Sequence, residues 1–198
     1  AIAMGKANVS SLYKYYSWNE SAFPESSFRM TFVSNHDKNA WDGTMFEQFG
    51  DALDAAIVLS VVGEGMPLIY NGQEAGNPKR LEFFEKDPIE WQDHYIGKLY
   101  KDLFALLKQN TALWHAEWGA TMIRIPNNNE LEILSFVREN EDDKVFAVFN
   151  FSDKQQMANF KEKLYYGTYT DYFTGEEYEL GPDFTLEMEP WSYKVYVK

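Results

Sequence analysis

Two short apolar segments of the chain run directly into polar side chains with hydrogen-bonding and acid–base capacity. Residues 32–37 read Phe-Val-Ser-Asn-His-Asp, and residues 65–74 read Gly-Met-Pro-Leu-Ile-Tyr-Asn-Gly-Gln-Glu. Each apolar part is typical of a buried parallel strand. Because a parallel β/α barrel forms its active site at the carboxyl ends of its strands, the pattern places Asp37 and Glu74 at such an edge.

Asp37 is the strongest candidate for a catalytic carboxylate. A carboxylate at the end of a barrel strand can stabilise a cationic transition state or bind sugar hydroxyls. His36 can donate to a hydroxyl beside it, and the amide of Asn35 can orient either neighbour. The same Asn-His-Asp triplet is equally typical of a turn that caps the segment after it.

Glu74 occupies the corresponding place after the second apolar segment. Asp37 and Glu74 could form a catalytic pair, one the acid and one the nucleophile, with carboxyl groups about 5–5.5 Å apart in a retaining enzyme. Alternatively, Glu74 is buried against backbone amides at the barrel mouth and holds the loop. The spacing leaves both hypotheses open.

Other charged residues nearby are weaker candidates. Lys79 and Arg80 follow the Glu74 loop and can reach a substrate there, although a solvated loop charge is commoner. The next loop offers ligands for a hard cation, but an acidic loop is ordinary in an acidic chain; these residues are Glu82, Glu85 and Asp87. His94 and His115 have no partner at metal-ligand spacing, so we expect structural or surface roles.

Composition disfavours several partners. The 198 residues carry a net charge of −13, which repels nucleic acid and anionic membranes. There is no cysteine, hence no disulfide or thiolate metal site. No apolar run approaches the roughly 18 residues of a membrane span. Aromatic residues reach 17%, which suits the flat faces of sugars, although most are expected in the core.

The chain begins Ala-Ile-Ala-Met-Gly-Lys, which is too short and polar for a signal peptide. Because a native start would normally put Met first, we expect the sequence to be cut from a longer one. Hydropathy divides it into two units, 1–115 and 116–198, and predicts an α/β unit followed by an all-β unit.

In the first unit, helical periodicity covers residues 8–18 and strands are predicted at 28–33 and 66–70. A capping box at residues 44–47 begins a helix that continues to Gly63. The next helix is expected to start at an Asp93 cap, with a buried stripe of Ile96, Leu99, Tyr100, Leu103, Phe104 and Leu107.

In the second unit the period changes to two, which predicts an antiparallel β-sandwich. The expected strands are 120–125, 131–137, 144–151, 156–160, 166–173, 184–188 and 192–197. Two parallel strands alone cannot close a barrel, and an open edge invites pairing. We therefore expect the sandwich to be the stable part, with self-association possible through the open barrel edge.

The motifs resemble the alpha-amylase family of glycoside hydrolases. Residues 32–37 resemble its last catalytic-domain motif region, residues 65–74 its eighth-strand motif, and residues 83–91 the loop that follows. The β-rich tail, ending Pro-Trp-Ser-Tyr-Lys-Val at residues 190–195, resembles its carboxyl-terminal sandwich domain. The implied fold class is α/β plus all-β, namely the last βα units of a TIM barrel followed by an antiparallel β-sandwich.

The resemblance implies that Asp37 is the family's third carboxylate, a transition-state stabiliser that grips the hydroxyls of the distorted sugar. His36 would contact the same sugar, Asn35 would support it, Arg80 would touch substrate, and Glu74 would be structural. No segment before residue 28 resembles the family's nucleophile and acid/base motifs, so the isolated chain is expected to be inactive.

The implied whole parent cleaves α-1,4-glucan oligosaccharides or starch with retention and is secreted or periplasmic. Its calcium ligands would lie mostly upstream, so no cofactor is expected in this chain. Two other hypotheses remain: a stand-alone carbohydrate-binding or interaction module, and a parent that performs transglycosylation or isomerisation, since acceptor choice is made by loops not seen here.

Overall fold

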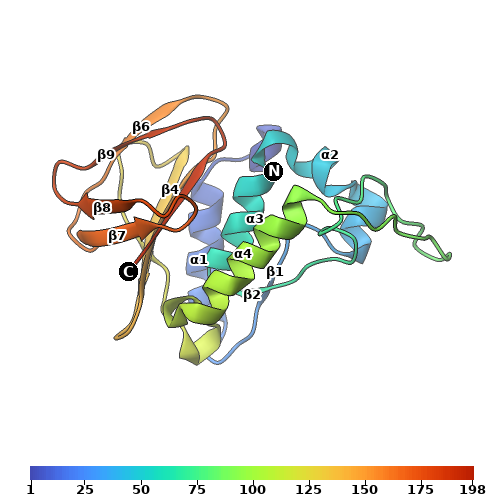
Figure 1. Cartoon of the computed structure of the whole chain (residues 1–198), viewed down its shortest axis with the longest axis horizontal. Helices are drawn as coiled ribbons and strands as arrows, with labels where there is room; N and C mark the ends of the chain where they lie inside the picture. Colours follow the sequence, from blue (N-terminus) through green and yellow to red (C-terminus); the bar gives the residue numbers. More distant parts are fainter.

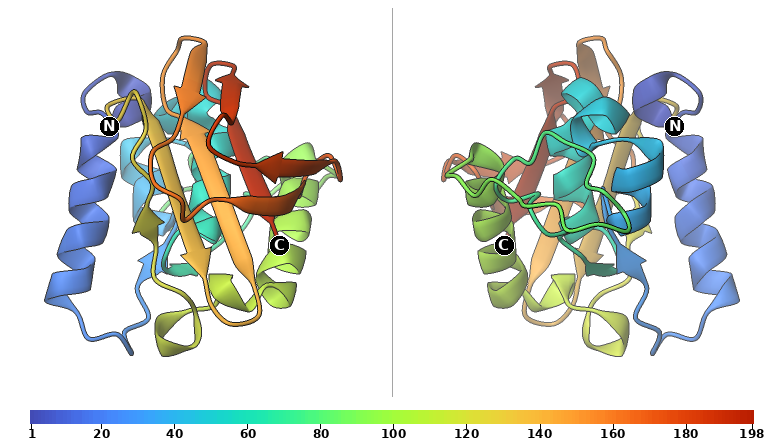
Figure 2. Two further views of the ribbon diagram at one scale, coloured as in Figure 1. Left: turned by 90° about the vertical axis from the view of Figure 1, so that its left-hand side faces the viewer. Right: turned by 90° about the vertical axis from the view of Figure 1, so that its right-hand side faces the viewer.

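The computed structural model describes residues 1–198. Three helices, α1 (Ser10–Ala22), α3 (Leu53–Val62) and α4 (Tyr95–Gln109), pack on one face of a large antiparallel sheet (Figures 1 and 2). None of the helices has the length and apolar character needed to cross a bilayer. The short helical turns are η1 (Ile2–Met4), η2 (Lys38–Asp42), α2 (Met45–Phe49), η3 (Gly50–Ala52), η4 (Thr111–Leu113) and η5 (Ala116–Trp118).

The two predicted parallel strands exist and pair with each other in parallel. They are β1 (Met30–Thr31) and β2 (Met66–Pro67), each only two residues long instead of spanning 28–33 and 66–70. Each of these strands pairs only with the other. The pairing is short because the polar segments that follow use their backbone hydrogen bonds in turns.

The predicted capping box is confirmed, but the helix after it is not continuous. Thr44 Oγ1 accepts from the Glu47 amide at 3.2 Å, and Glu47 Oε2 accepts from the Thr44 amide at 2.7 Å. Gly50, with φ 51°, breaks the helix into α2, η3 and α3, because that left-handed conformation does not continue a right-handed helix. Gly63 then closes α3 by donating to the Leu59 carbonyl.

The predicted Asp93 cap of α4 is wrong. His94 is the N-cap residue, and its Nδ1 accepts from the Ile96 amide at 3.3 Å. An unprotonated imidazole nitrogen can replace a carboxylate in this role because it also offers a lone pair. The predicted apolar stripe is largely confirmed, with Leu106 added; the fully buried members are Ile96, Tyr100, Leu103, Leu106 and Leu107.

The second unit is an antiparallel β-sandwich. The large sheet has the order β3-β4-β5-β10-β7-β8, and a two-stranded sheet β6-β9 packs against it. The strands are β3 (Ile123–Arg124), β4 (Ile133–Glu139), β5 (Lys144–Asn150), β6 (Gln156–Asn159), β7 (Gly167–Asp171), β8 (Glu177–Leu180), β9 (Thr185–Met188) and β10 (Tyr193–Val197). Only β8 lacks a predicted counterpart, because its alternation of glutamates with Tyr178 and Leu180 spans only four residues directly after a turn signal.

The central strands of the large sheet bury both faces. In β4, Leu134 and Phe136 pack toward the helices, whereas Ile133 and Val137 pack toward the β6-β9 sheet. Successive side chains of a strand point to opposite faces, so β4 contributes to two hydrophobic clusters. The larger cluster draws residues from both sides of the predicted boundary at 115/116, which itself remains a prediction.

One buried guanidinium joins the helical layer to the sandwich. Arg138, at the end of β4, is 2% exposed and donates only to backbone carbonyls: those of Val62, Gly63, Leu113, Trp114 and Ala120. The first two belong to the carboxyl end of α3, where the helix dipole favours a cation. Burial lowers the pKa of Arg138 to about 10, so the group still carries its charge at neutral pH.

The backbone around this guanidinium is tightly packed. Gly119 has no room for a side chain, since a Cβ there would lie 1.8 Å from the Trp114 carbonyl oxygen that Arg138 holds. A glycine is therefore required by close approach at this position rather than by its own φ angle. The segment between α4 and β3 is fixed by this contact.

We predict that Arg138→Met lowers the free energy of unfolding by about 3 kcal/mol, because it leaves several buried carbonyls without donors. Urea unfolding followed by circular dichroism measures this. Arg124→Met is the matched control: Arg124 is exposed, so its loss should cost under about 1 kcal/mol. Equal stabilities of the two variants would contradict a joining role for Arg138.

Candidate functional site

The predicted site residues follow β1 on a turn. Val33 and Ser34 are buried, and the Asn35 side chain then accepts from the Lys38 amide at 2.8 Å, which starts η2. This cap leaves the side chains of His36 and Asp37 66% and 61% exposed, with His36 Nε2 3.6 Å from Asp37 Oδ2. The capping role considered for this triplet is therefore real for Asn35, and it presents His36 and Asp37 to solvent.

The segment after β1 is tied to the loop after β2 by buried amides. Asn39 donates to the Lys79 carbonyl at 3.3 Å and accepts from the Leu81 amide at 2.8 Å. Asn77 also donates to the Lys79 carbonyl, at 3.1 Å. These contacts hold the two polar segments side by side, as expected of neighbouring parallel strands, although residue pattern alone did not single out Asn39 or Asn77.

Glu74 serves the loop that contains it. Its Oε2 accepts from the Gly72 amide at 3.1 Å, which agrees with the loop-holding hypothesis. The neighbouring Gln73 is buried, accepts from the Tyr70 amide at 2.6 Å, and donates to the Tyr100 hydroxyl at 3.2 Å. Gln73 thereby anchors the loop to α4. The roles assigned to Asp37 and Glu74 remain predictions.

Arg80 is engaged by an acidic partner. Its Nε and Nη2 lie 3.0 Å and 3.1 Å from the two carboxylate oxygens of Glu47, a bidentate pair. Lys79 pairs with Asp87 through a single contact, and Asp87 also accepts from the Glu82 amide. Both cations are thus held by the protein itself, and what Arg80 contributes to ligand binding remains a prediction.

The structure brings an aromatic cluster next to Asp37 that residue spacing did not reveal. Phe83 lies 5.8 Å from the His36 ring, 5.5 Å from Trp41 and 4.8 Å from Phe84, measured between ring centroids. Trp41 and Phe84 are 62% and 83% exposed. The sequence signal that could have identified this cluster is the presence of aromatic residues in otherwise polar loops, because exposed apolar patches commonly mark binding sites.

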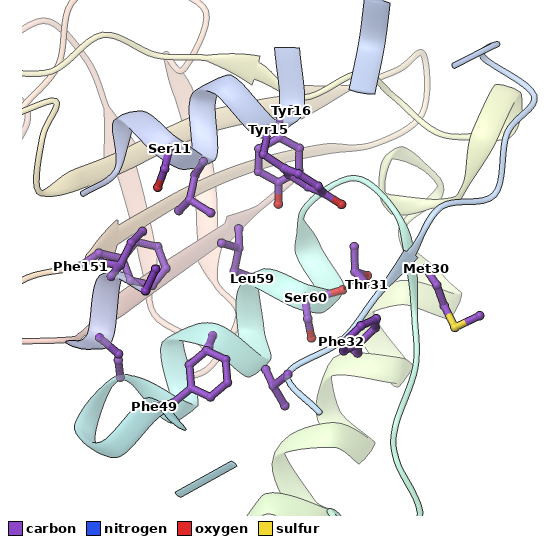
Figure 3. Close-up of a pocket in the computed structure, with 17 residues that line it drawn as sticks. Ser11, Tyr15, Tyr16, Met30, Thr31, Phe32, Phe49, Leu59, Ser60 and Phe151 are labelled. Atoms are coloured by element: carbon purple, nitrogen blue, oxygen red, sulfur yellow. Dashed lines mark hydrogen bonds between the residues drawn. The ribbon is translucent and has the colours of Figure 1, made fainter. Parts of the chain in front are cut away.

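An apolar groove of about 450 Å³ runs along β1 on the side away from β2. Residues from α1, β1 and α3 line it, among them Tyr16, Phe32 and Leu59 (Figure 3). Its lining carries no charged side chain, so it offers packing surface rather than chemistry.

The chain contains no group of three or more acidic or histidine side chains placed to hold a metal ion. Asp87 pairs with Lys79 and accepts from the backbone amide of Glu82, and His94 caps α4.

Residues 123–195 match the family model described as maltogenic amylase, C-terminal domain. Alpha-amylase 2 of Dictyoglomus thermophilum is 28% identical over 171 residues, covering 78% of this chain and 28% of that protein. The 1,4-alpha-glucan branching enzyme of Francisella philomiragia is 32% identical over 136 residues, covering 59% and 20%. The chain thus spans under a third of the length of these relatives.

The fold has solved counterparts. A maltogenic alpha-amylase from Thermotoga neapolitana superposes with a TM-score of 0.82 at 16% identity, over 100% of this chain and 47% of that one. An alpha-amylase from Geobacillus thermoleovorans, solved with acarbose, gives 0.73 at 14% identity, over 100% and 44%. The chain thus consists of a parallel α/β unit followed by a β-sandwich. The comparisons support an alpha-amylase family C-terminal domain over residues 123–195, in agreement with the resemblance predicted from the sequence.

We predict that Asn39→Ala loosens the loop after β2. The substitution leaves the Leu81 amide unpaired and the Lys79 carbonyl with Asn77 as its remaining donor, so it should lower the free energy of unfolding by about 1–2 kcal/mol and speed hydrogen exchange at Leu81. Asn71→Ala, at an exposed position, is the control and should change neither quantity. Unchanged exchange in Asn39→Ala would show that the two loops are not coupled.

We also predict a pH dependence at α2. Arg80 and the Thr44 amide lower the pKa of Glu47 to about 2. Because this folded-state pKa lies below the unfolded value, the pair stabilises the fold above the unfolded pKa, and this stabilisation is lost as pH falls toward 2. A carboxyl ¹³C titration should show the low midpoint, and Arg80→Met should raise it; Lys79→Met should not.

Proposed function

We propose that this chain is the carboxyl-terminal part of a glycoside hydrolase that acts on α-glucans. It supplies the last βα units of a (β/α)₈ barrel together with the sandwich that follows. The observation that carries this proposal is the side-by-side placement of the two polar segments after β1 and β2, linked by Asn39. The relatives named alpha-amylase and branching enzyme support the choice of an α-glucan.

The proposed role of Asp37 is to grip sugar hydroxyls and stabilise positive charge. An exposed carboxylate accepts several hydrogen bonds, and these strengthen as an oxocarbenium-like transition state develops. His36 beside it donates to the same sugar, and the aromatic cluster of Trp41, Phe83 and Phe84 gives a flat apolar surface for the ring. Arg80 is held against α2 by Glu47. Its proposed role is to border this surface.

The free edge of β1 supports the barrel assignment. In a closed barrel every strand has two neighbours, whereas β1 pairs only with β2. The apolar groove beside β1 offers the packing surface that a further strand and its flanking side chains would cover. In the isolated chain the same edge would be the place of any self-association.

Retaining hydrolysis needs both a nucleophile and a proton donor on either side of the bond. Asp37 is assigned to neither role, and Glu74 accepts from a backbone amide in its own loop. Contacts made to the transition state without these two groups bind substrate but do not turn it over. The chain by itself is therefore a binding half of an active site.

We predict that the purified chain releases no reducing ends from maltoheptaose. The protein expressed from the whole reading frame that contains this chain should hydrolyse it, and Asp37→Asn in that protein should lower kcat by about a hundredfold or more. Clear turnover by the isolated chain that vanishes in Asp37→Asn would refute the proposal and restore the Asp37/Glu74 catalytic pair.

A second candidate function is a stand-alone carbohydrate-binding module. The exposed aromatic cluster favours it, because Trp41 and Phe84 present large rings to solvent that can bind a sugar without any reaction. Affinity electrophoresis in amylose gels separates the two functions. Strong retardation of the isolated chain, lost in Trp41→Ala, supports the module, whereas weak retardation supports an incomplete active-site cleft.

A further inference from the structure

A polar hollow of about 360 Å³ lies at the opposite end of β1 and β2 from Asp37. Its walls come from the segment before β1, the turn before β2, and the segment between α4 and β3. Arg29, Glu64 and His115 are among its lining residues, and we call it the Arg29–His115 hollow. Its polar lining contrasts with the apolar groove beside α1.

Two polar atoms of this hollow are buried without a hydrogen-bond partner: Arg29 Nε and His115 Nδ1. The other nitrogens of Arg29 are occupied, Nη1 by the Asn19 carbonyl at 3.1 Å and Nη2 by Glu64 at 3.5 Å. Burial, together with the charge of Arg138, lowers the pKa of His115 against the opposing effect of a backbone hydrogen bond at Gly65, which favours a neutral imidazole. Unpaired buried polar atoms are unfavourable, so a ligand is rewarded where a small side-chain shift lets its hydroxyls pair with them.

The lining chemistry favours a neutral, hydroxyl-rich ligand over an anion. Glu20, Glu25 and Glu64 all line the hollow, and their charges oppose a phosphate or carboxylate. Arg138 also lines it, but all three of its nitrogens already donate to backbone carbonyls. A hydroxyl both donates and accepts, so it suits a site that mixes carboxylates, a guanidinium nitrogen and an imidazole.

Aromatic rings line the hollow or lie beside it. Phe28 and Trp114 line it, and the Trp118 ring lies 5.7 Å from Phe28 between centroids. Phe28 and Trp118 are 50% and 59% exposed. A hollow with hydrogen-bonding groups inside and exposed ring faces outside matches a pyranose, which has hydroxyls on its rim and C–H groups on its face.

We propose that the Arg29–His115 hollow is a second saccharide-binding site, which takes one glucose unit at the end of a short α-glucan. The sugar ring packs on Phe28 and Trp118, and its hydroxyls reach Arg29, Glu64 and His115. The hollow itself rests on the geometry above, whereas the choice of an α-glucan rests on the proposed function. Such a site would hold a glucan chain on the protein at a distance from Asp37.

The test is a titration of the ¹⁵N-labelled chain with maltotriose, read at the indole N–H groups. We expect the Trp114 and Trp118 signals to shift saturably. Trp118→Ala, at an exposed position, and His115→Phe, which keeps a ring but removes Nδ1, should each weaken this binding about fivefold, the effect of one lost contact. Inorganic phosphate, added as a second probe, should leave both signals in place.

Variants at the far end keep this proposal separable from the proposed function. Asp37→Asn and Trp41→Ala should leave the affinity at Trp118 unchanged, and the Trp41 indole reports the Asp37 end independently. A folded chain whose Trp114 and Trp118 signals do not shift, or shift with phosphate, overturns the second site, as does wild-type affinity in both His115→Phe and Trp118→Ala. Loss of response at Trp41 alone would count against the proposed function and not against the hollow.

Discussion

The structure depends on how Arg138 is satisfied. Its guanidinium lies at the end of a sandwich strand, and its partners are carbonyls from the end of α3, from η4 and from the approach to β3. A buried cation with no carboxylate in contact is tolerated here because many carbonyl dipoles surround it, including the negative end of a helix. This side chain joins the end of α3 to the sheet, next to the hydrophobic cluster that packs the helices on it.

The position of the helical layer in turn fixes the loops that carry the candidate site. α3 packs beside the parallel pair, and α4 receives the buried Gln73 through Tyr100. Asn39 then links the segments after β1 and β2, so the backbone segments that carry Asp37, Arg80 and Phe83 are joined by direct hydrogen bonds. Preorganisation of this kind is what a site needs when its groups contact a sugar only in the transition state.

The parallel pair β1 and β2 also has a second end with its own chemistry. One end opens toward Asp37 and the aromatic cluster, and the other opens into the Arg29–His115 hollow, lined by groups of both charges. Both ends combine exposed rings with hydrogen-bonding side chains, which is the combination that sugars require. A protein that handles long polymers gains from gripping them at more than one place, because a second contact raises the effective concentration at the first.

Local sequence patterns predicted which segments are helices or strands and which polar residues follow the parallel strands. Period-two segments specified the sandwich, the capping box at Thr44 specified a helix start, and the polar residues after the apolar runs specified Asp37 and Glu74 as candidates. These follow from local rules of side-chain alternation and backbone hydrogen bonding, which act over a few residues. Local rules failed where a competing group was equally suitable, as with His94 in place of Asp93 at the start of α4.

The contacts between segments that are distant in the chain could be identified only from the folded structure. Arg138 reads as an ordinary charged residue of a strand, and Asn39, Gln73 and His115 carry no distinctive spacing. Their roles arise from partners that are far apart along the chain, such as Val62 for Arg138 and Leu81 for Asn39. Packing brings such partners together, and the free energy of satisfying buried polar groups then favours one arrangement. A local sequence pattern does not indicate which distant residues will become partners.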